Sequence, residues 1–395
     1  MEETGDLKTK KMQLNIGPSH PATHGTLRLL VEVDGENIVN TAAEMGYLHR
    51  GFEKHCEVGT YTQVIPYTDR LNYISPLMNN VGYCMAVEKL IGCEIPERVQ
   101  VIRVIISELS RITDHMVCMG TNVVDLGALT NFWYYFNARE KIYDFIEKIC
   151  GARLTTNYTR IGGLMRDLHP DAPTEIRAIL KEVMRATKDV RGLLEKNKIF
   201  IDRTSGVGAI SAEEAVNYGF TGPCLRAAGV PYDIRKAQPY LGYENYDFDI
   251  PVAETGDTYD RFLVRFEEII QSGRIIEQAL EKLKPGPIMT NDRRVALPPK
   301  SEVYTNIEAL MNHFKLIYEG VKPPAGEVYS ATEAANGELG FYIVSDGGTH
   351  PYRVKCRPPC FPLYAAYPKL MEGGMIADAI AILGSINIIA GELDR

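Results

Sequence analysis

The chain has 395 residues, of which 45% are hydrophobic and 24% are charged, a balance typical of a globular protein with a substantial core. Its formal net charge is −8 and it has no long run of Lys and Arg, so it lacks the basic surface that nucleic-acid-binding proteins need. No stretch reaches the ~18 to 20 consecutive apolar residues that a membrane span needs. A chain of this kind that works at a membrane is expected to do so through partner proteins.

The N-terminal sequence MEETGDLKTKK is polar and opens with acidic residues. It lacks the apolar segment of a signal peptide and the Arg-rich character of a transit peptide, so it predicts a cytoplasmic location. The eight cysteines form no CxxC pair, and we expect them to be reduced, small apolar residues. Only Cys356 and Cys360 are close enough in sequence to offer a metal site as the alternative.

The first part of the chain is predicted to form strands. MQLNI, LRLLVEV and NIVNTAA favour strands, and the last two flank an Asp-Gly turn, which is a hairpin signal. The loop between the first two strands, GPSHPATHG at residues 17–25, holds two histidines among two glycines and two prolines. Pro21 lies between His20 and His24 and argues against a helical pair of metal-binding histidines. From residue type alone, a surface turn with incidental histidines stays open as the alternative.

The middle of the chain is predicted to be helical. From Glu97 towards Gly127, apolar residues recur every three or four positions, the spacing of one helix face. Asp114 and Asp125 are eleven residues apart, close to three turns, so they share roughly one side of that helix. We expect at least one of these carboxylates to approach the core, where it needs a partner because an unpaired buried charge is costly.

The remaining patterns complete the predicted fold class, which is α+β and predominantly α-helical. Further long helical patterns cover residues 78–92, 132–150, 174–196 and 258–283. Their lengths indicate a bundle with antiparallel neighbours. After Glu302 we expect a helix, then strands at 327–334 and 340–347, then a final helical segment. The predicted divisions are a small N-terminal β-rich domain at residues 1–60, a central helical bundle at 61–300 and an α/β region at 301–395, together one compact unit.

Common catalytic templates do not fit the chain. SGVGAIS at residues 205–211 lacks the third glycine of a dinucleotide fingerprint. The overlapping SAEEAV is a capping box that opens an ordinary helix. The sequence has no GxxxxGKS/T, GxSxG or HExxH motif.

Six motifs in order along the chain carry a family resemblance: GPSHPATHGTLRL, GYLHRGFEKH, PYTDRLNYIS, YDRFLVRFEE, FYIVSDGGTHPYRVK and the terminal GSINIIAGELDR. On these motifs the chain resembles the 49-kDa-type, or D-type, subunit of proton-pumping NADH:quinone oxidoreductase, which is respiratory complex I. That family is related to the large subunit of nickel-iron hydrogenases, so the resemblance implies a hydrogenase large-subunit-like fold.

The metal-binding motifs of the hydrogenases are absent. Where their first CxxC would follow an arginine, this chain has Arg70 followed by Asn72 and Ser75 in the thiolate places, and the region of the second CxxC ends in ELDR. Because soft thiolates hold nickel and iron, hydrogen activation is excluded on chemical grounds. No metal ligands are expected in this chain.

The resemblance implies that the cavity left behind, against which the C-terminal region packs, holds a quinone headgroup. Quinone reduction takes two electrons and two protons, so hydrogen-bond donors are needed at both carbonyl oxygens. Position by position, the headgroup ligands fall on His24 and Tyr73, and the acid paired with the histidine falls on Asp125. We expect Asp125 to orient the imidazole and favour its protonated form. His20 is expected to support the loop.

Electrons are expected from a 4Fe-4S cluster in a smaller adjacent subunit, since this chain has no cysteine set for such a cluster. Arg50 matches an arginine beside that cluster, and an ion pair with Glu53 or another acid is the alternative. Arg70 and Asp69 are expected to be structural. The resemblance further implies other peripheral-arm and membrane-arm subunits as partners, and a peripheral place on the cytoplasmic side of the cell membrane.

Two positions depart from the family pattern. Thr155 stands where many members have a histidine, and threonine does not titrate in the working range. We therefore hypothesise a cluster potential that is lower and less pH-dependent, suited to a low-potential acceptor such as menaquinone. Asn387 stands where the family often has an acid, and its role stays open. Two other functions also stay open: a non-catalytic scaffold, and the acceptor subunit of a related complex fed by ferredoxin or coenzyme F420 rather than NADH.

Overall fold

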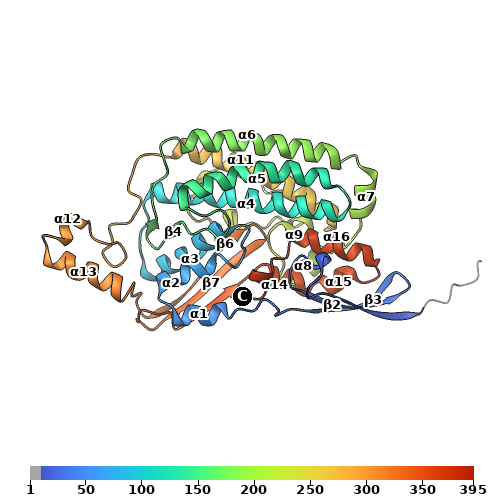
Figure 1. Ribbon diagram of the computed structural model, residues 1–395, viewed down its shortest axis with the longest axis horizontal. Helices are drawn as coiled ribbons and strands as arrows, with labels where there is room; N and C mark the ends of the chain where they lie inside the picture. Colours follow the sequence, from blue (N-terminus) through green and yellow to red (C-terminus); the bar gives the residue numbers. More distant parts are fainter. Residues whose placement is uncertain (1–9) are drawn as a thin grey trace, which may run out of the picture.

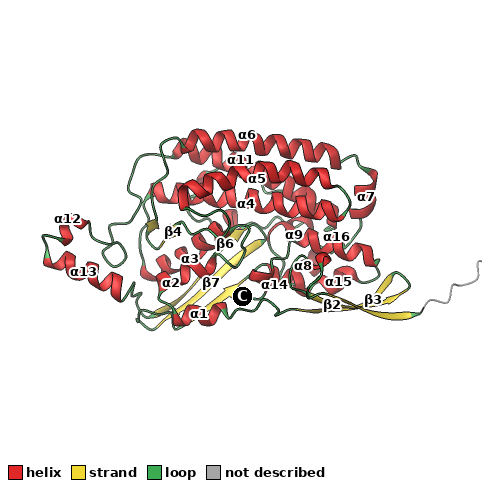
Figure 2. Ribbon diagram, viewed as in Figure 1, coloured by secondary structure: helices red, strands yellow, loops and turns green. Residues whose placement is uncertain are grey.

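The computed structural model describes residues 10–395, so the first nine residues of the predicted N-terminal domain lie outside the described part. Long helices form a layer along one side of the molecule, and strands with shorter helices form the other side (Figure 1, Figure 2). The long-helix layer consists of α4 (Glu97–Asp125), α5 (Leu129–Cys150), α6 (Ala172–Leu194) and α11 (Thr258–Lys282), and the long helix α3 (Pro76–Ile91) lies on the other side, with the strands. Each of them confirms a helical pattern predicted from the sequence.

Helix α4 is the central element of the bundle. It packs against α3, α5, α11 and α16 (Ile376–Ile386), and every residue from 101 to 120 is buried. A helix buried on all sides must satisfy its polar side chains within the protein, because water does not reach them. The helix ends at Asp125, and Gly127 has a positive φ of 93° that turns the chain towards α5.

The N-terminal strands form a three-stranded antiparallel sheet in the order β1 (Lys11–Ile16), β2 (Arg28–Asp34) and β3 (Asn37–Glu44), as the sequence predicted. Leu29, Val31 and Val33 alternate along β2 and are buried, the pattern of a strand with one covered face. The β1–β2 connection contains one short 3-10 turn, η1 (Pro21–Thr23). The loop with the two histidines therefore projects from the end of this sheet.

The second large sheet is antiparallel, in the order β6 (Gly326–Ala334), β7 (Gly337–Ser345) and β8 (Arg353–Arg357). The β6–β7 pair confirms the two predicted strands, whereas β8 was not predicted. Cys356 lies on β8 and Cys360 opens α14, and both thiols are free and buried. The sheet packs on α3.

Shorter elements make up the rest of the described chain. They are β4 (Thr159–Arg160), β5 (Gly163–Leu164), η2 (Tyr243–Asn245), α1 (Phe52–Val58), α2 (Tyr61–Thr68), α7 (Lys198–Thr204), α8 (Ala212–Asn217), α9 (Gly222–Ala227), α10 (Ile234–Ala237), α12 (Lys300–Val303), α13 (Ile307–Tyr318), α14 (Cys360–Ala365), α15 (Tyr367–Met371) and α17 (Ala390–Leu393). The predicted capping box opens α8, with Ser211 and Glu214 bonded reciprocally. The final helical segment is divided rather than continuous, because Asn387 in the left-handed region ends α16 before α17 begins.

Three hydrophobic cores hold these elements together. The first lies within the long-helix bundle, and the third lies between α1–α3 and the β6–β7–β8 sheet. The second joins Leu29 of the first sheet, Phe220 and Leu383 of α16. The N-terminal strands thus share a core with the C-terminal helices, and the domain boundaries at 60 and 300 stay a prediction. Within residues 10–395, no helix is both long and apolar enough to cross a membrane.

Candidate functional site

The loop between β1 and β2 is held by its own hydrogen bonds. Nδ1 of His20 accepts from the backbone N–H of Ala22 at 3.1 Å, and the buried Thr23 hydroxyl donates to the His20 carbonyl at 2.7 Å. Gly17 has a φ of 93°, and a Cβ there would lie 1.9 Å from the carbonyl oxygen of Leu27, so only glycine fits. His20 therefore shapes the loop, as expected.

His24 ends this turn and contacts helix α4. Its backbone is left-handed, with a φ of 50°, and its Nε2 lies 2.7 Å from Oδ2 of Asp125, the last residue of α4. The two side chains are 22% and 28% exposed, so the ion pair is only partly shielded from solvent. With Nε2 facing the carboxylate, Nδ1 is the ring nitrogen left for a ligand.

Tyr73 lies in the turn between α2 and α3. It is half-buried, and its hydroxyl makes no hydrogen bond with another residue of the described part of the chain. Burial raises the pKa of Tyr73, Cys360 and Asp114 add to the shift, and Arg50 opposes it. The phenol is therefore protonated at neutral pH and able to donate a hydrogen bond.

Helix α17 connects the two segments that carry His24 and Tyr73. A Cβ on Gly25 would lie 3.2 Å from the Cβ of Ala390, the first residue of α17. A Cβ on Gly391 would lie 2.5 Å from the carbonyl oxygen of Arg70, three residues before Tyr73. The structure thus brings the histidine loop and the tyrosine turn against one short helix.

Arg50 lies beside the same helix. Its guanidinium donates to the carbonyls of Arg70 at 2.6 Å and Gly391 at 3.4 Å. The alternative ion pair with Glu53 is not formed, because Glu53 contacts three other cations: Arg353, Lys355 and Arg395. Burial and the nearby Arg70 lower the pKa of Arg50, which as a guanidinium still stays charged.

Arg70 and Asp69 lie at the C-terminal end of α2, in positions that fit the structural roles expected for them. The Arg70 guanidinium donates to the Pro66 carbonyl at 2.7 Å and lies 3.4 Å from Asp69. Asp69 is buried, accepts from Asn80, and has its pKa raised by burial to about 7. Thr155 is half-buried in the loop between α5 and β4.

Asp114, in the middle of α4, is fully buried and has no cation within ion-pair distance among residues 10–395. Its Oδ2 accepts from Nδ2 of Asn72 at 2.8 Å and from Oγ of Ser75 at 3.1 Å. Its Oδ1 accepts from Nδ2 of Asn387 at 2.6 Å. The partner expected for a buried acid is thus a set of three neutral donors. Two of them stand in the thiolate places, and the third is the departure at position 387.

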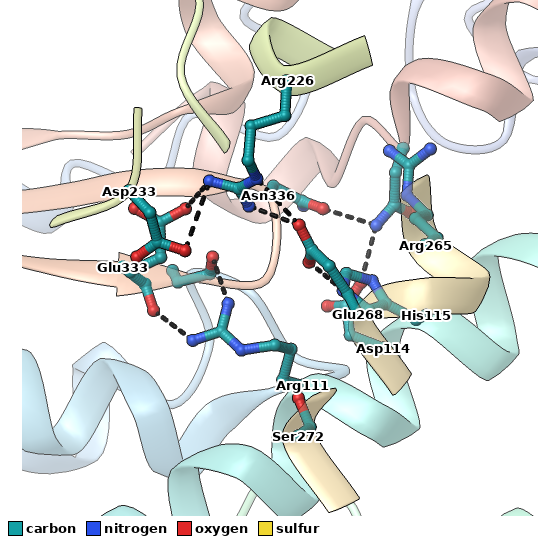
Figure 3. Close-up of polar contacts among 12 residues, drawn as sticks. Arg111, Asp114, His115, Arg226, Asp233, Arg265, Glu268, Ser272, Glu333 and Asn336 are labelled. Atoms are coloured by element: carbon teal, nitrogen blue, oxygen red, sulfur yellow. Dashed lines mark hydrogen bonds and ion pairs between the residues drawn. The ribbon is translucent and has the colours of Figure 1, made fainter. Parts of the chain in front are cut away.

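A network of buried ion pairs adjoins Asp114 through its neighbour His115 (Figure 3). Nε2 of His115 lies 2.7 Å from Glu268, and Arg226 donates to both Glu268 and Glu333 and lies 3.6 Å from Asp233. Burial raises the pKa of Glu268, but Arg226 and His115 lower it further, so it lies well below its ordinary value. These side chains are all buried.

The network continues along α4 to Glu108. Burial raises the pKa of Glu108, but Arg111 and Arg235 hold it at about 2. Arg111 also donates to the Glu333 carbonyl at 2.7 Å, which joins α4 to β6. Sequence reasoning missed this network, although its signal was present: charged residues at positions 108 and 111 flank the apolar stripe of the predicted helix.

The carboxylates of the terminal ELDR segment anchor it to other parts of the chain. Asp394 accepts from the backbone N–H groups of Gly46 at 2.9 Å and Leu48 at 2.7 Å. Glu392 is 1% exposed, and its carboxyl accepts from the N–H of Cys360 at 3.2 Å. Burial raises the pKa of Glu392 to about 7. The sequence marked this segment only as a family motif.

The chain is similar in sequence to known proteins over nearly its whole length. Residues 125–395 match the family described as the 49 Kd subunit of respiratory-chain NADH dehydrogenase. The chain is 57% identical over 389 residues to the C/D-type subunit of NADH-quinone oxidoreductase from Bdellovibrio bacteriovorus, covering 98% of this chain and 70% of that protein. It is 55% identical to the D-type subunit from Myxococcus xanthus, covering 98% and 94%, and 54% identical to a D-type subunit from Sorangium cellulosum, covering 99% and 97%.

The family match and these relatives define a subunit of an oxidoreductase complex. The chain belongs to the family of 49-kDa, or D-type, subunits of NADH-quinone oxidoreductase, the respiratory complex I.

Replacing Glu392 with glutamine tests whether its carboxyl group is buried with a raised pKa. The folded-state pKa of about 7 exceeds the ordinary value of 4.5, so the wild-type chain loses stability as pH rises from 4.5 to 7. We expect Glu392→Gln to be more stable than wild type at pH 8, by up to about 3 kcal/mol, and to lose this advantage near pH 4.5.

The measurement is chemical denaturation of the full chain at both pH values. Glu372→Gln is the control, because Glu372 has a side chain that is 61% exposed and should show no such pH-dependent difference. A Glu392→Gln difference that is equal at the two pH values would contradict the assigned burial.

Proposed function

We propose that this chain forms the quinone-reducing site of a proton-pumping NADH:quinone oxidoreductase, with His24 and Tyr73 as headgroup ligands and Asp125 as the partner of His24. The observation that supports this most is the 2.7 Å contact between His24 and Asp125, residues distant in sequence whose pairing the family resemblance requires. The half-buried Tyr73 hydroxyl, which lacks a protein partner among the described residues, supports the second ligand.

The chemistry follows from the two donors. Reduction of a quinone to a quinol adds two electrons and two protons, and negative charge develops on the carbonyl oxygens as electrons arrive. The Nδ1–H of His24 would stabilise one oxygen and the Tyr73 hydroxyl the other, and each can then transfer its proton. Asp125 holds the imidazole in place and compensates its positive charge before the proton leaves.

The proposed electron donor is a 4Fe-4S cluster in a small adjacent subunit. Among residues 10–395 no group of three or more His, Cys, Asp or Glu side chains could hold a metal ion. Arg50 has no carboxylate partner in this part of the chain, and in the proposal its charge faces the cluster. A fixed cation favours the reduced cluster and raises its potential.

The wider assignment is also a proposal. A hydrogenase large-subunit-like fold is supported by the position of Asn72 and Ser75 around one buried point, where the related enzymes would place thiolates. The proposed partners are the small iron-sulfur subunit, other peripheral-arm subunits and membrane-arm subunits, on the cytoplasmic side of the membrane. The combined C/D name of the Bdellovibrio relative supports a C-type subunit as one peripheral-arm partner.

The alternative functions make different demands on the site. A scaffold without a catalytic role has no need for a paired His24 and Asp125 beside a donor at Tyr73, so the formed pair favours the enzyme. Feeding by ferredoxin or coenzyme F420 would change the upstream subunits and leave these three residues in the same roles.

Removing the Tyr73 hydroxyl should uncouple quinone reduction from upstream electron flow. In membranes carrying Tyr73→Phe, we expect quinone reductase activity to fall at least about tenfold because one proton donor is lost. Electron delivery from NADH to an artificial acceptor upstream of the quinone should persist, which shows assembly.

Tyr134→Phe is the matched control, because Tyr134 is 44% exposed on α5. In this variant, quinone reduction and electron delivery to the artificial acceptor should both equal those of the wild type. Unchanged quinone reduction in Tyr73→Phe would place the headgroup elsewhere and would favour the scaffold.

The residue at position 155 should set how the cluster potential depends on pH. With Thr155 we expect a shallow dependence, and Thr155→His should steepen it towards one proton per electron, about 59 mV per pH unit. Redox titration of the cluster in the assembled complex at several pH values measures this, with Thr155→Val as the non-titrating control. A wild-type slope near one proton per electron would sink the hypothesis and its corollary, a menaquinone-type acceptor.

A further inference from the structure

We infer that Asp114 is a positioning residue for Tyr73, and that helix α4 therefore places both proposed headgroup ligands, Tyr73 through Asp114 and His24 through Asp125. This inference rests on the proposed function. It assigns a role to a buried carboxylate that pairs with no cation in the described part of the chain and accepts only from neutral side chains.

The turn that carries Tyr73 is tied to Asp114 on both sides. Asn72 precedes Tyr73 and donates to Oδ2 of Asp114, while Ser75 follows it by two residues and donates to the same oxygen. The Asn72 side chain also accepts from the backbone N–H groups of Ile74 at 3.1 Å and Ser75 at 3.3 Å. The backbone at Tyr73 is thus held between two side chains that meet on one oxygen atom.

The chemistry of the clamp favours a carboxylate at position 114. Asn72 and Ser75 present an N–H and an O–H that both need an acceptor, and both side chains are fully buried. A carboxylate oxygen accepts both bonds and leaves its second oxygen for Asn387, whereas an amide would offer one acceptor atom and one donor group. We call the set of Asn72, Ser75, Asp114 and Asn387 the Asp114 clamp.

Helix α4 makes this placement rigid. Asp114 and Asp125 are eleven residues apart, about 16 Å along the helix axis. The helix around Asp114 is buried against α5, α11 and α16, so its position does not depend on either loop. The spacing between the two ligand-bearing segments is therefore set by a packed helix, the arrangement that holds a site most precisely in place.

The clamp also explains the departure at position 387. Nδ2 of Asn387 donates to Oδ1 of Asp114 and to Oδ1 of Asn336. An acid at this position would place two buried carboxyl groups face to face, and one of them would have to hold a proton. With asparagine, the clamp in this chain carries a single acid and needs no shared proton.

A double-mutant cycle on the assembled complex in membranes tests this inference. Ser75→Ala deletes one clamp bond next to Tyr73, and we expect quinone kcat to fall about threefold to tenfold. In a Tyr73→Phe background the same change should have an effect within about twofold, because a positioning residue has nothing left to position. Asp114→Asn, carried through the same cycle, should show a larger effect with the same non-additivity.

Two controls make the result specific. Ser107→Ala removes a buried serine of α4 that lies outside the clamp and should leave quinone kcat and KM unchanged. NADH-driven reduction of the upstream artificial acceptor should be equal in all variants, which shows that the complex assembles.

The inference is overturned if Ser75→Ala leaves quinone kcat unchanged. It is also overturned if Ser75→Ala lowers kcat by the same factor in the Tyr73→Phe background as in the wild type. Failure of Ser75→Ala to assemble while Ser107→Ala assembles would make the clamp a folding element and would overturn it as well. If Tyr73→Phe itself has no effect, the proposed quinone site fails. If Tyr73→Phe strongly lowers quinone reduction but the two effects are independent, the proposed quinone site stands and only the positioning role of Asp114 is rejected.

Discussion

The need to compensate buried charge on helix α4 organises this structure. The helix carries Glu108, Arg111 and Asp114 at positions that water does not reach. Each must find its partner inside the protein, since leaving a buried charge without its partner costs about 3–5 kcal/mol. Glu108 pairs with Arg235, and Arg111 donates to a carbonyl group of β6. Asp114 accepts from Asn72 in the tyrosine turn and from Asn387 at the end of α16. Distant parts of the chain are thereby fixed to one helix.

The same helix relates the interior to the proposed site. Its Asp114 is held by neutral donors, so the interior of the fold contains a central point where side chains from separate segments meet by hydrogen bonding. Its last residue, Asp125, lies at the surface against His24. Helix α17 closes the arrangement by packing against both Gly25 and the carbonyl of Arg70. The rigid bundle and the terminal helix together hold two otherwise irregular segments in place.

The sequence predicts regular elements well and tertiary partners poorly. The helix that begins at Glu97 and the strands before the Asp-Gly turn were predicted because their periodicity is local. The pairing of His24 with Asp125 came from the family resemblance, since no local pattern links residues so far apart. The donors around Asp114 come from three separate segments, so burial implied a partner without identifying Asn387. Strand β8 was missed because five residues give little periodicity.

The proposed function depends most on where the quinone headgroup lies, and a structure of the assembled membrane complex with a bound quinone analogue would show this directly. We expect one carbonyl oxygen within about 3 Å of the Tyr73 hydroxyl and the other at a similar distance from Nδ1 of His24, with Nε2 still on Asp125. A headgroup that contacts neither side chain, or a His24 that leaves Asp125 and binds elsewhere without quinone contact, would contradict the proposal.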